Sequence, residues 1–158
     1  MKSSFTVDCK VLECRKGKRK LKIRAGGLCL LWGDDIKVSL LTSLDSHIDV
    51  VITEQNNHPW RFTGIYGQPK VEKRYLTWAL IKNLKDKCGY PWVLGGDFNE
   101  IVSLQEKEGG LMRRSRQMES FQQTITDCSL RSMHASGPCF TWRRVRHGVE
   151  VKEKLDRF

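Results

Sequence analysis

The sequence has 158 residues, 39% of them hydrophobic and 29% charged, and its 28 Lys and Arg against 18 Asp and Glu give a formal net charge of +10. This composition is typical of a folded domain and excludes a disordered chain, and the basic excess indicates a polyanionic partner, most commonly nucleic acid. No apolar run approaches the roughly 20 residues of a membrane span, and the first ten residues contain no signal core, so we expect an intracellular protein, nuclear or cytoplasmic.

The first element expected in chain order is the apolar strand at residues 28–32, which follows Gly26-Gly27 and ends at the turn residues 33–35. Alternating apolar residues then predict strands at 36–40, 48–52 and 60–64. Four strands in such close succession favour an antiparallel meander. The preceding basic cluster, from Lys10 to Arg24, favours a solvated hairpin or loop.

The hydrophobic period changes after residue 70. Leu76, Leu80 and Leu84 recur at helical spacing and predict an amphipathic helix over residues 71–87. A short apolar strand follows at 92–96, and one apolar face predicts a second helix through Met118, Phe121, Ile125 and Cys128. Strand-like sequence recurs at 140–142 and 154–158, so the order of elements predicts an α/β or α+β layered sandwich.

Six cysteines occur, without a C-x-x-C pair, and no histidine pair has zinc-finger spacing. Free thiols in a reducing compartment are therefore expected. Cys29 and Cys128 fall at apolar positions of predicted elements and are expected to be buried.

The strand at 92–96 runs into the polar sequence GGDFNE, which places Asp97 and Asn99 two residues apart at its end. In extended backbone such residues point the same way. The carboxylate could accept a proton from an attacking water and the amide could donate to a phosphoryl oxygen. An Asx-turn that closes the strand is the structural alternative. The Tyr66 phenol could donate to a phosphate, and its structural alternative is a half-buried core tyrosine. Asp156 is a carboxylate in strand-like sequence, and its structural alternative is a surface ion pair.

The order of these motifs carries more information than any one of them. FTGIYG, a helix, WVLGGDFNEI, EKEGG, RQMESF, SGPCFTW and KLDR follow one another from about Gly26 onward. This series resembles the endonuclease/exonuclease/phosphatase superfamily, and more narrowly the abasic-endonuclease-like nuclease domain of plant LINE-type (non-LTR) retrotransposons. We therefore expect residues 1–25 to be a basic segment outside the resemblance and residues 26–158 to be a partial domain.

The resemblance implies a deoxyribonuclease-like fold, which is a four-layer sandwich of two mixed β-sheets flanked by helices. It implies Mg²⁺-dependent hydrolysis of phosphodiesters in DNA, with no obligate protein partner. Its catalytic residues match Asp97, Asn99, Tyr66 and Asp156, and Asp97 and Asn99 are the nearest candidates for metal ligands. The residues expected to contact DNA are Trp142, Arg143, Arg144 and Arg116.

Two parts of the family pattern have no match in this sequence. The family carries an Asn and a metal-binding Glu before the strand at 28–32, and a Ser-Asp-His element beyond KLDR. We therefore expect a domain that is truncated at both ends and impaired in catalysis. The alternatives are a catalytically dead fragment that at most binds nucleic acid non-specifically, and a phosphatase or phosphodiesterase of the same superfamily.

Overall fold

The computed structural model of the chain describes residues 3–16, 19–55, 58–146 and 148–158. The chain divides into two compact units. The first comprises Met1–Tyr66 with Tyr90–Val93, and the second comprises Gly67–Gly89 with Leu94–Phe158.

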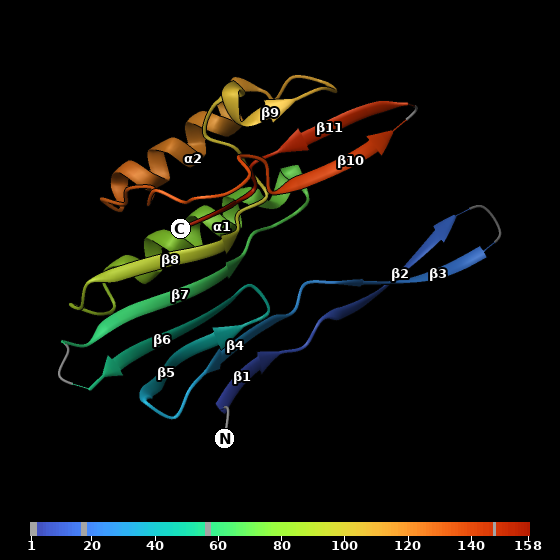
Figure 1. Ribbon diagram of the computed structural model, residues 1–158. Helices are drawn as coiled ribbons and strands as arrows, with labels where there is room; N and C mark the ends of the chain where they lie inside the picture. The colour runs from blue at the N-terminus through green and yellow to red at the C-terminus, as the bar shows by residue number, and fades with distance from the viewer. Residues whose placement is uncertain (1–2, 17–18, 56–57, 147) are drawn as a thin grey trace. The chain divides into compact units, whose positions relative to one another are not determined.

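The first unit is built from antiparallel strands (Figure 1). Strands β5 (Ile36–Leu44), β6 (His47–Glu54) and β7 (Trp60–Tyr66) pair in chain order, as alternating apolar residues predict. Strand β1 (Ser3–Val7) pairs with β4 (Leu28–Trp32), and β2 (Lys10–Lys16) forms a hairpin with β3 (Arg19–Ala25). The hairpin carries the first basic cluster, whose side chains, Lys22 apart, lie outside the described residues.

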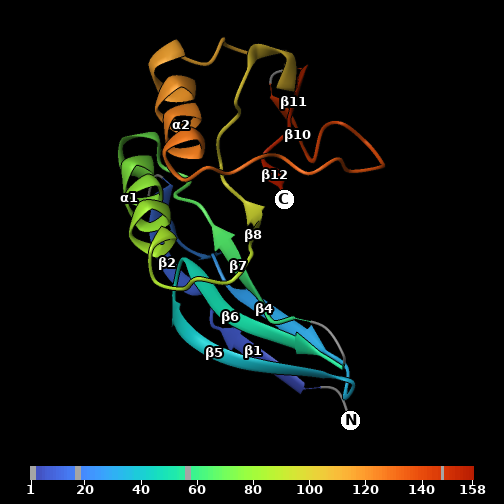
Figure 2. The same cartoon turned by 90° about the vertical axis from the view of Figure 1, so that its left-hand side faces the viewer.

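The expected four-strand meander is wrong in its first strand. Strand β4 pairs with β1, not with β5, so the meander contains only β5, β6 and β7. The reason is burial: Leu28 and Leu30 of β4 pack against a cluster of Ile48, Val50 and Ile52 on β6. Strand β4 thus covers the apolar face of the meander, beside β6 in Figure 2, and does not extend its edge.

A buried polar group crosses the meander. The Arg61 guanidinium donates to both carboxylate oxygens of Asp49 at 2.8 Å, and the Thr63 hydroxyl donates to Asp49 Oδ1 at 2.6 Å. Trp92 Nε1 donates to Thr63 at 2.8 Å, and the Arg61 guanidinium lies 4.8 Å from the centre of the Trp92 ring. Arg61 and Asp49 are fully buried, so their charges are compensated by each other.

The second unit alternates helices with short strands. In chain order its elements are η1 (Val71–Lys73), α1 (Arg74–Lys85), the end of β8 (Trp92–Asp97), η2 (Leu104–Glu106), β9 (Lys107–Glu108), α2 (Ser115–Asp127), β10 (Trp142–Arg146), β11 (Val149–Glu153) and β12 (Asp156–Arg157). Strand β11 pairs with β10 and β9, and β12 pairs with β8. The strand expected at 140–142 begins only at Trp142. Just before it, Thr141 Oγ1 accepts from the backbone N–H groups of Leu155 and Asp156.

Helix α1 begins after the single turn η1, and its buried face differs from the expected one. The Leu76 side chain is 43% exposed, whereas Trp78, Ile81 and Leu84 are buried together with Arg74 and Thr77. The leucine spacing fits a helical face equally well, but the large Trp78 ring stacks on Phe121 of α2, with ring centres 4.4 Å apart. That contact turns Leu76 toward solvent.

Helix α2 buries Met118, Phe121 and Thr124, close to the expected face. Cys128, just after this helix, is buried as expected, but Cys29 is exposed because it lies on the outer side of β4. No helix within the described residues is long and apolar enough to cross a membrane.

Candidate functional site

The polar sequence after β8 forms a tight turn. Asp97 Oδ1 accepts a hydrogen bond from the backbone N–H of Asn99 at 2.8 Å, and Asn99 has a φ of 55°. This is the Asx-turn geometry that both residue types favour. The Asn99 side chain donates from Nδ2 to the Gly67 carbonyl at 2.9 Å, so one of its two amide hydrogens fixes the turn.

Two backbone segments clamp the turn. Gly67 donates from its N–H to the Asp97 carbonyl at 2.6 Å, and Phe98 donates to the Leu155 carbonyl at 2.9 Å. A Cβ atom on Gly67 would lie 2.5 Å from the Phe98 carbonyl oxygen. Gly67 is therefore required by the close approach of the turn, which holds Asp97 and Asn99 in fixed positions.

Asp156 lies directly across from Asp97. The two residues are register partners in the antiparallel pair of β12 with β8. Burial raises the pKa of Asp97, and the charge of Asp156 raises it further, while the Asn99 N–H and the charge of Arg74 act in the opposite direction. The structure thus brings Asp97, Asn99 and Asp156 together, as the sequence motifs GGDFNE and KLDR imply.

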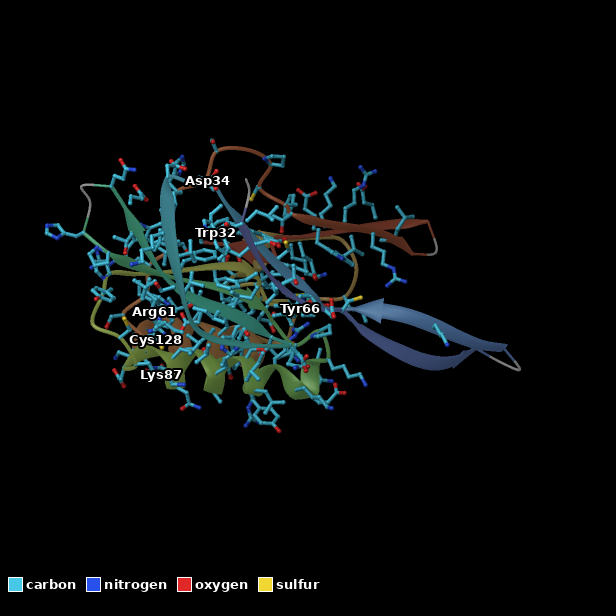
Figure 3. All side chains as sticks on the ribbon, turned by 90° about the horizontal axis from the view of Figure 1, so that it is seen from below. Trp32, Asp34, Arg61, Tyr66, Lys87 and Cys128 are labelled. Atoms are coloured by element: carbon cyan, nitrogen blue, oxygen red, sulfur yellow. The ribbon has the colours of Figure 1, made fainter. Side chains whose placement is uncertain are left out.

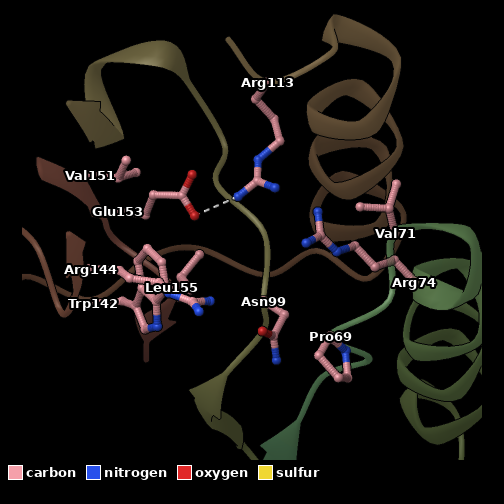
Figure 4. Close-up of a pocket in the computed structure, with 10 residues that line it drawn as sticks. All are labelled: Pro69, Val71, Arg74, Asn99, Arg113, Trp142, Arg144, Val151, Glu153 and Leu155. Carbon is pink, nitrogen blue, oxygen red and sulfur yellow. Dashed lines mark hydrogen bonds and ion pairs between the residues drawn. The ribbon is translucent and has the colours of Figure 1, made fainter. Parts of the chain in front are cut away.

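A cavity of 620 Å³ opens beside the turn (Figure 4). Asn99 lines it together with Trp142 and Arg144 of β10, which the sequence marks as DNA-contacting residues. Arg74 and Arg113 line it from α1 and from the segment before α2. The lining contains three arginines and one acid, Glu153, so the cavity is suited to an anionic ligand.

A chain of ion pairs fixes the two arginines that enter the cavity. Arg74 Nη1 lies 2.6 Å from Glu100 Oε2, and Arg113 Nη2 lies 2.7 Å from Glu153 Oε2. Arg113 Nε also lies 3.1 Å from Glu100 Oε1, an ionic contact without hydrogen-bond alignment. Lys107 completes the series at Glu153. Glu100 is fully buried and serves this network.

The remaining predicted residues are Tyr66, Arg143 and Arg116. Tyr66 is half-buried at the end of β7 in the first unit, where its ring lies beside Gly26 (Figure 3). Arg143 is ion-paired with Glu150 and its side chain is 72% exposed. Arg116 lines a second cavity with Arg74 and Arg114. No group of three or more potential metal-binding side chains was found in the described part of the chain.

Sequence reasoning missed Arg74, Lys107 and Glu153. Arg74 lies in a helix that was predicted from the spacing of its leucines, which says nothing about its charged residues. Glu153 is brought to Arg113 by the pairing of β11 with β9, which is distant in sequence. The one available signal was the basic cluster at 113–116. Its first member, Arg113, lies in the site, and the others line neighbouring cavities.

Comparison with known proteins supports the fold. No protein-family model and no curated protein matches the sequence. Among solved structures, the chain resembles the endonuclease domain of TRAS1, a telomere-specific non-LTR retrotransposon, with a TM-score of 0.67 and 15% sequence identity. The match covers 98% of this chain and 65% of that one, so the chain spans less than two thirds of its neighbour's length.

The fold class is therefore mixed α/β, with several sheets and two α-helices among the described residues, and the chain shares the deoxyribonuclease-like fold of this neighbour. This confirms the fold class that the order of motifs implies. At 15% identity the likeness concerns the fold, and the chemistry has to be argued from the residues.

Proposed function

We propose that the chain is a nuclease domain of the non-LTR retrotransposon type, which hydrolyses phosphodiester bonds in DNA at the Asp97–Asn99 turn. The observation that carries the proposal is the register pairing of Asp97 with Asp156, beside a cavity lined by Asn99 and three arginines. The likeness to the TRAS1 endonuclease domain supports it at the level of fold. We infer the non-LTR retrotransposon type from that likeness and from the order of the sequence motifs.

The residues divide the chemistry among themselves. Asp97, whose pKa is raised by burial and by Asp156, accepts a proton from the attacking water or orients it. Asn99 has a second amide hydrogen that does not serve Gly67 and that can donate to a phosphoryl oxygen. Arg74 and Arg113 supply positive charge to the phosphate without moving, because Glu100 and Glu153 hold them.

The donor set fits Mg²⁺. Asp97 and Asp156 are neighbouring carboxylates that concentrate negative charge, and the charge of Asp156 raises the pKa of Asp97. Carboxylate and amide oxygens are the ligands that a hard cation prefers. Asp97 and Asn99 would hold the ion, which supplies neutralisation of charge on the phosphate when bound. Mg²⁺ commonly binds through one or two carboxylates plus substrate phosphates, so we infer weak binding before DNA arrives and slow turnover.

A second candidate is a module that binds DNA without cutting it. It is favoured by the structural role of the turn residues. Asp97 Oδ1 accepts from the Asn99 N–H, and Asn99 Nδ2 donates to the Gly67 carbonyl, so both side chains stabilise the turn. These contacts explain both residue types without catalysis, and the basic cavity would serve binding alone.

One experiment separates the two candidates. Supercoiled plasmid is incubated with excess protein in Mg²⁺, with an EDTA arm, and bis(p-nitrophenyl) phosphate serves as a small phosphodiester. The proposal expects slow nicking of plasmid, lost in EDTA and reduced on the order of a hundredfold in Asp97→Ala. Salt-sensitive binding without nicking would establish the binding module. Faster turnover of the small diester than of DNA would indicate a phosphodiesterase.

A further inference from the structure

The most exposed large apolar side chains of the described chain lie next to each other. Leu111 is 92% exposed and Met112 is 76% exposed, on the connection between β9 and α2. Single exposed apolar residues are common on proteins, but two consecutive, nearly bare ones form a tip that water solvates poorly. Such a tip gains free energy when a partner covers it.

The connection is fixed at both ends, so the tip is held out from the protein. On one side, Gly109 has a φ of +71° and packs so closely on β11 that a Cβ atom would lie 2.0 Å from the Glu150 carbonyl oxygen. On the other side, Arg113 is held by Glu153 at 2.7 Å. A tip anchored in this way loses little conformational entropy on binding.

The surroundings of the tip are basic and continuous with the candidate site. Leu111 and Met112 line a cavity with Lys107, Arg113 and Arg114. Arg113 also lines the cavity beside Asn99, and Arg114 also lines the cavity that contains Arg116. An apolar tip beside these basic side chains complements a partner that is anionic outside and apolar within, which is the make-up of duplex DNA.

We propose that Leu111 and Met112 form an apolar wedge that inserts between base pairs of bound DNA while Arg114 and Arg116 contact the flanking phosphates. The proposal rests on the proposed function, since it takes DNA as the ligand of the adjacent site. Leu and Met are among the side chains that unstack base steps in this way. Phosphate contacts fix the register of the duplex, and the wedge kinks it toward the site that hydrolyses it.

The test uses the full chain and a short duplex that carries 2-aminopurine, whose fluorescence rises when its base is unstacked. The wedge variant is Leu111→Ser with Met112→Ser. The matched control is Leu44→Ser with Met133→Ser, which replaces residues that are 64% and 60% exposed at other places in the chain. Wild type and control are expected to raise the fluorescence on binding, and the wedge variant is not.

The wedge variant is also expected to bind about tenfold more weakly with an unchanged salt dependence, because its phosphate contacts remain. The variant Arg114→Gln with Arg116→Gln is expected to lower the slope of log affinity against log salt by about two, one for each phosphate contact. An unchanged slope of log affinity against log salt in this variant would show that Arg114 and Arg116 do not contact phosphates, and would overturn that part of the proposal.

The outcomes separate the wedge from the proposed function. DNA binding with the same fluorescence rise in wild type and wedge variant overturns the wedge and leaves the function intact. A wild-type chain that binds no DNA at low salt overturns both. If the wedge variant loses binding to phosphatidylserine vesicles while its DNA response is unchanged, the tip contacts a membrane and the wedge is overturned.

Discussion

Asp97 and Asp156 face each other across the antiparallel pair of β8 with β12, although they come from motifs far apart in the sequence. Burial and the neighbouring carboxylate both raise the pKa of Asp97. The fold therefore carries an electrostatic strain at this point that packing alone does not require. A strained, charged pair beside a basic cavity is typical of a functional site.

The first prediction concerns the pH dependence of stability. The pKa of Asp97 is higher in the folded than in the unfolded chain, so its contribution to stability is fully present below the unfolded pKa and is lost as the pH rises through the folded pKa. Asp97→Asn keeps the acceptor for the Asn99 N–H and removes the charge. We expect the variant to melt at a higher temperature than the wild type at neutral pH and to lose this gain in acid.

Thermal melts across the pH range measure this difference. Asp8→Asn, which removes an exposed carboxylate, is the control and is expected to melt like the wild type. A variant Asp97→Asn that is less stable than the wild type at neutral pH would show that the carboxylate stabilises the fold and that the site is not strained.

The second prediction concerns the buried ion pairs. Glu100 is fully buried between Arg74 and Arg113, and Glu100→Gln removes the carboxylate that pairs with Arg74, while Arg113 keeps its pair with Glu153. We expect the free energy of unfolding, measured in urea, to fall by about 3–5 kcal/mol. Lys82→Met breaks the exposed pair with Asp127, which solvent screens, and is expected to change stability far less. Equal costs for the two variants would contradict the assigned role of the network.

The third prediction concerns the clamp on the turn. Gly67→Ala places a methyl group against the Phe98 carbonyl, and the backbone has to move to accept it. We expect a cost of about 1–3 kcal/mol and slower hydrolysis, because Asp97 and Asn99 shift together. Gly89→Ala is the matched control, since nothing lies within 4 Å of its added Cβ. Should Gly67→Ala leave both stability and nicking unchanged, the clamp has no role in placing the site.

The local parts of the site could be predicted from the sequence, because their signals lie within a few residues. Asp97 lies at the end of β8, as expected from GGDFNE, and Asp97 and Asn99 form the Asx-turn that was the structural alternative. The KLDR motif predicted a role for Asp156 by resemblance, but its register opposite Asp97 depends on strand pairing, which single-sequence patterns do not specify.

The failures also have physical causes. The buried face of α1 depends on Trp78 stacking on Phe121 from a distant helix. Of the expected face, Leu84 is therefore buried, while Leu76 is exposed. The pairing of β4 with β1 depends on burial against β6 and not on chain order. Polar networks such as that of Glu100 have no periodicity, and patterns of hydrophobicity cannot detect them.

The most direct test of the central claim is a double-mutant cycle on plasmid nicking with Asp97→Ala, Asp156→Ala and the combined variant, in protein excess and Mg²⁺. If the two carboxylates act as one site, the combined variant is expected to be no slower than the worse single variant, because the loss of either disables the unit. Rate losses that multiply in the combined variant, or nicking that persists in all three, would contradict the account.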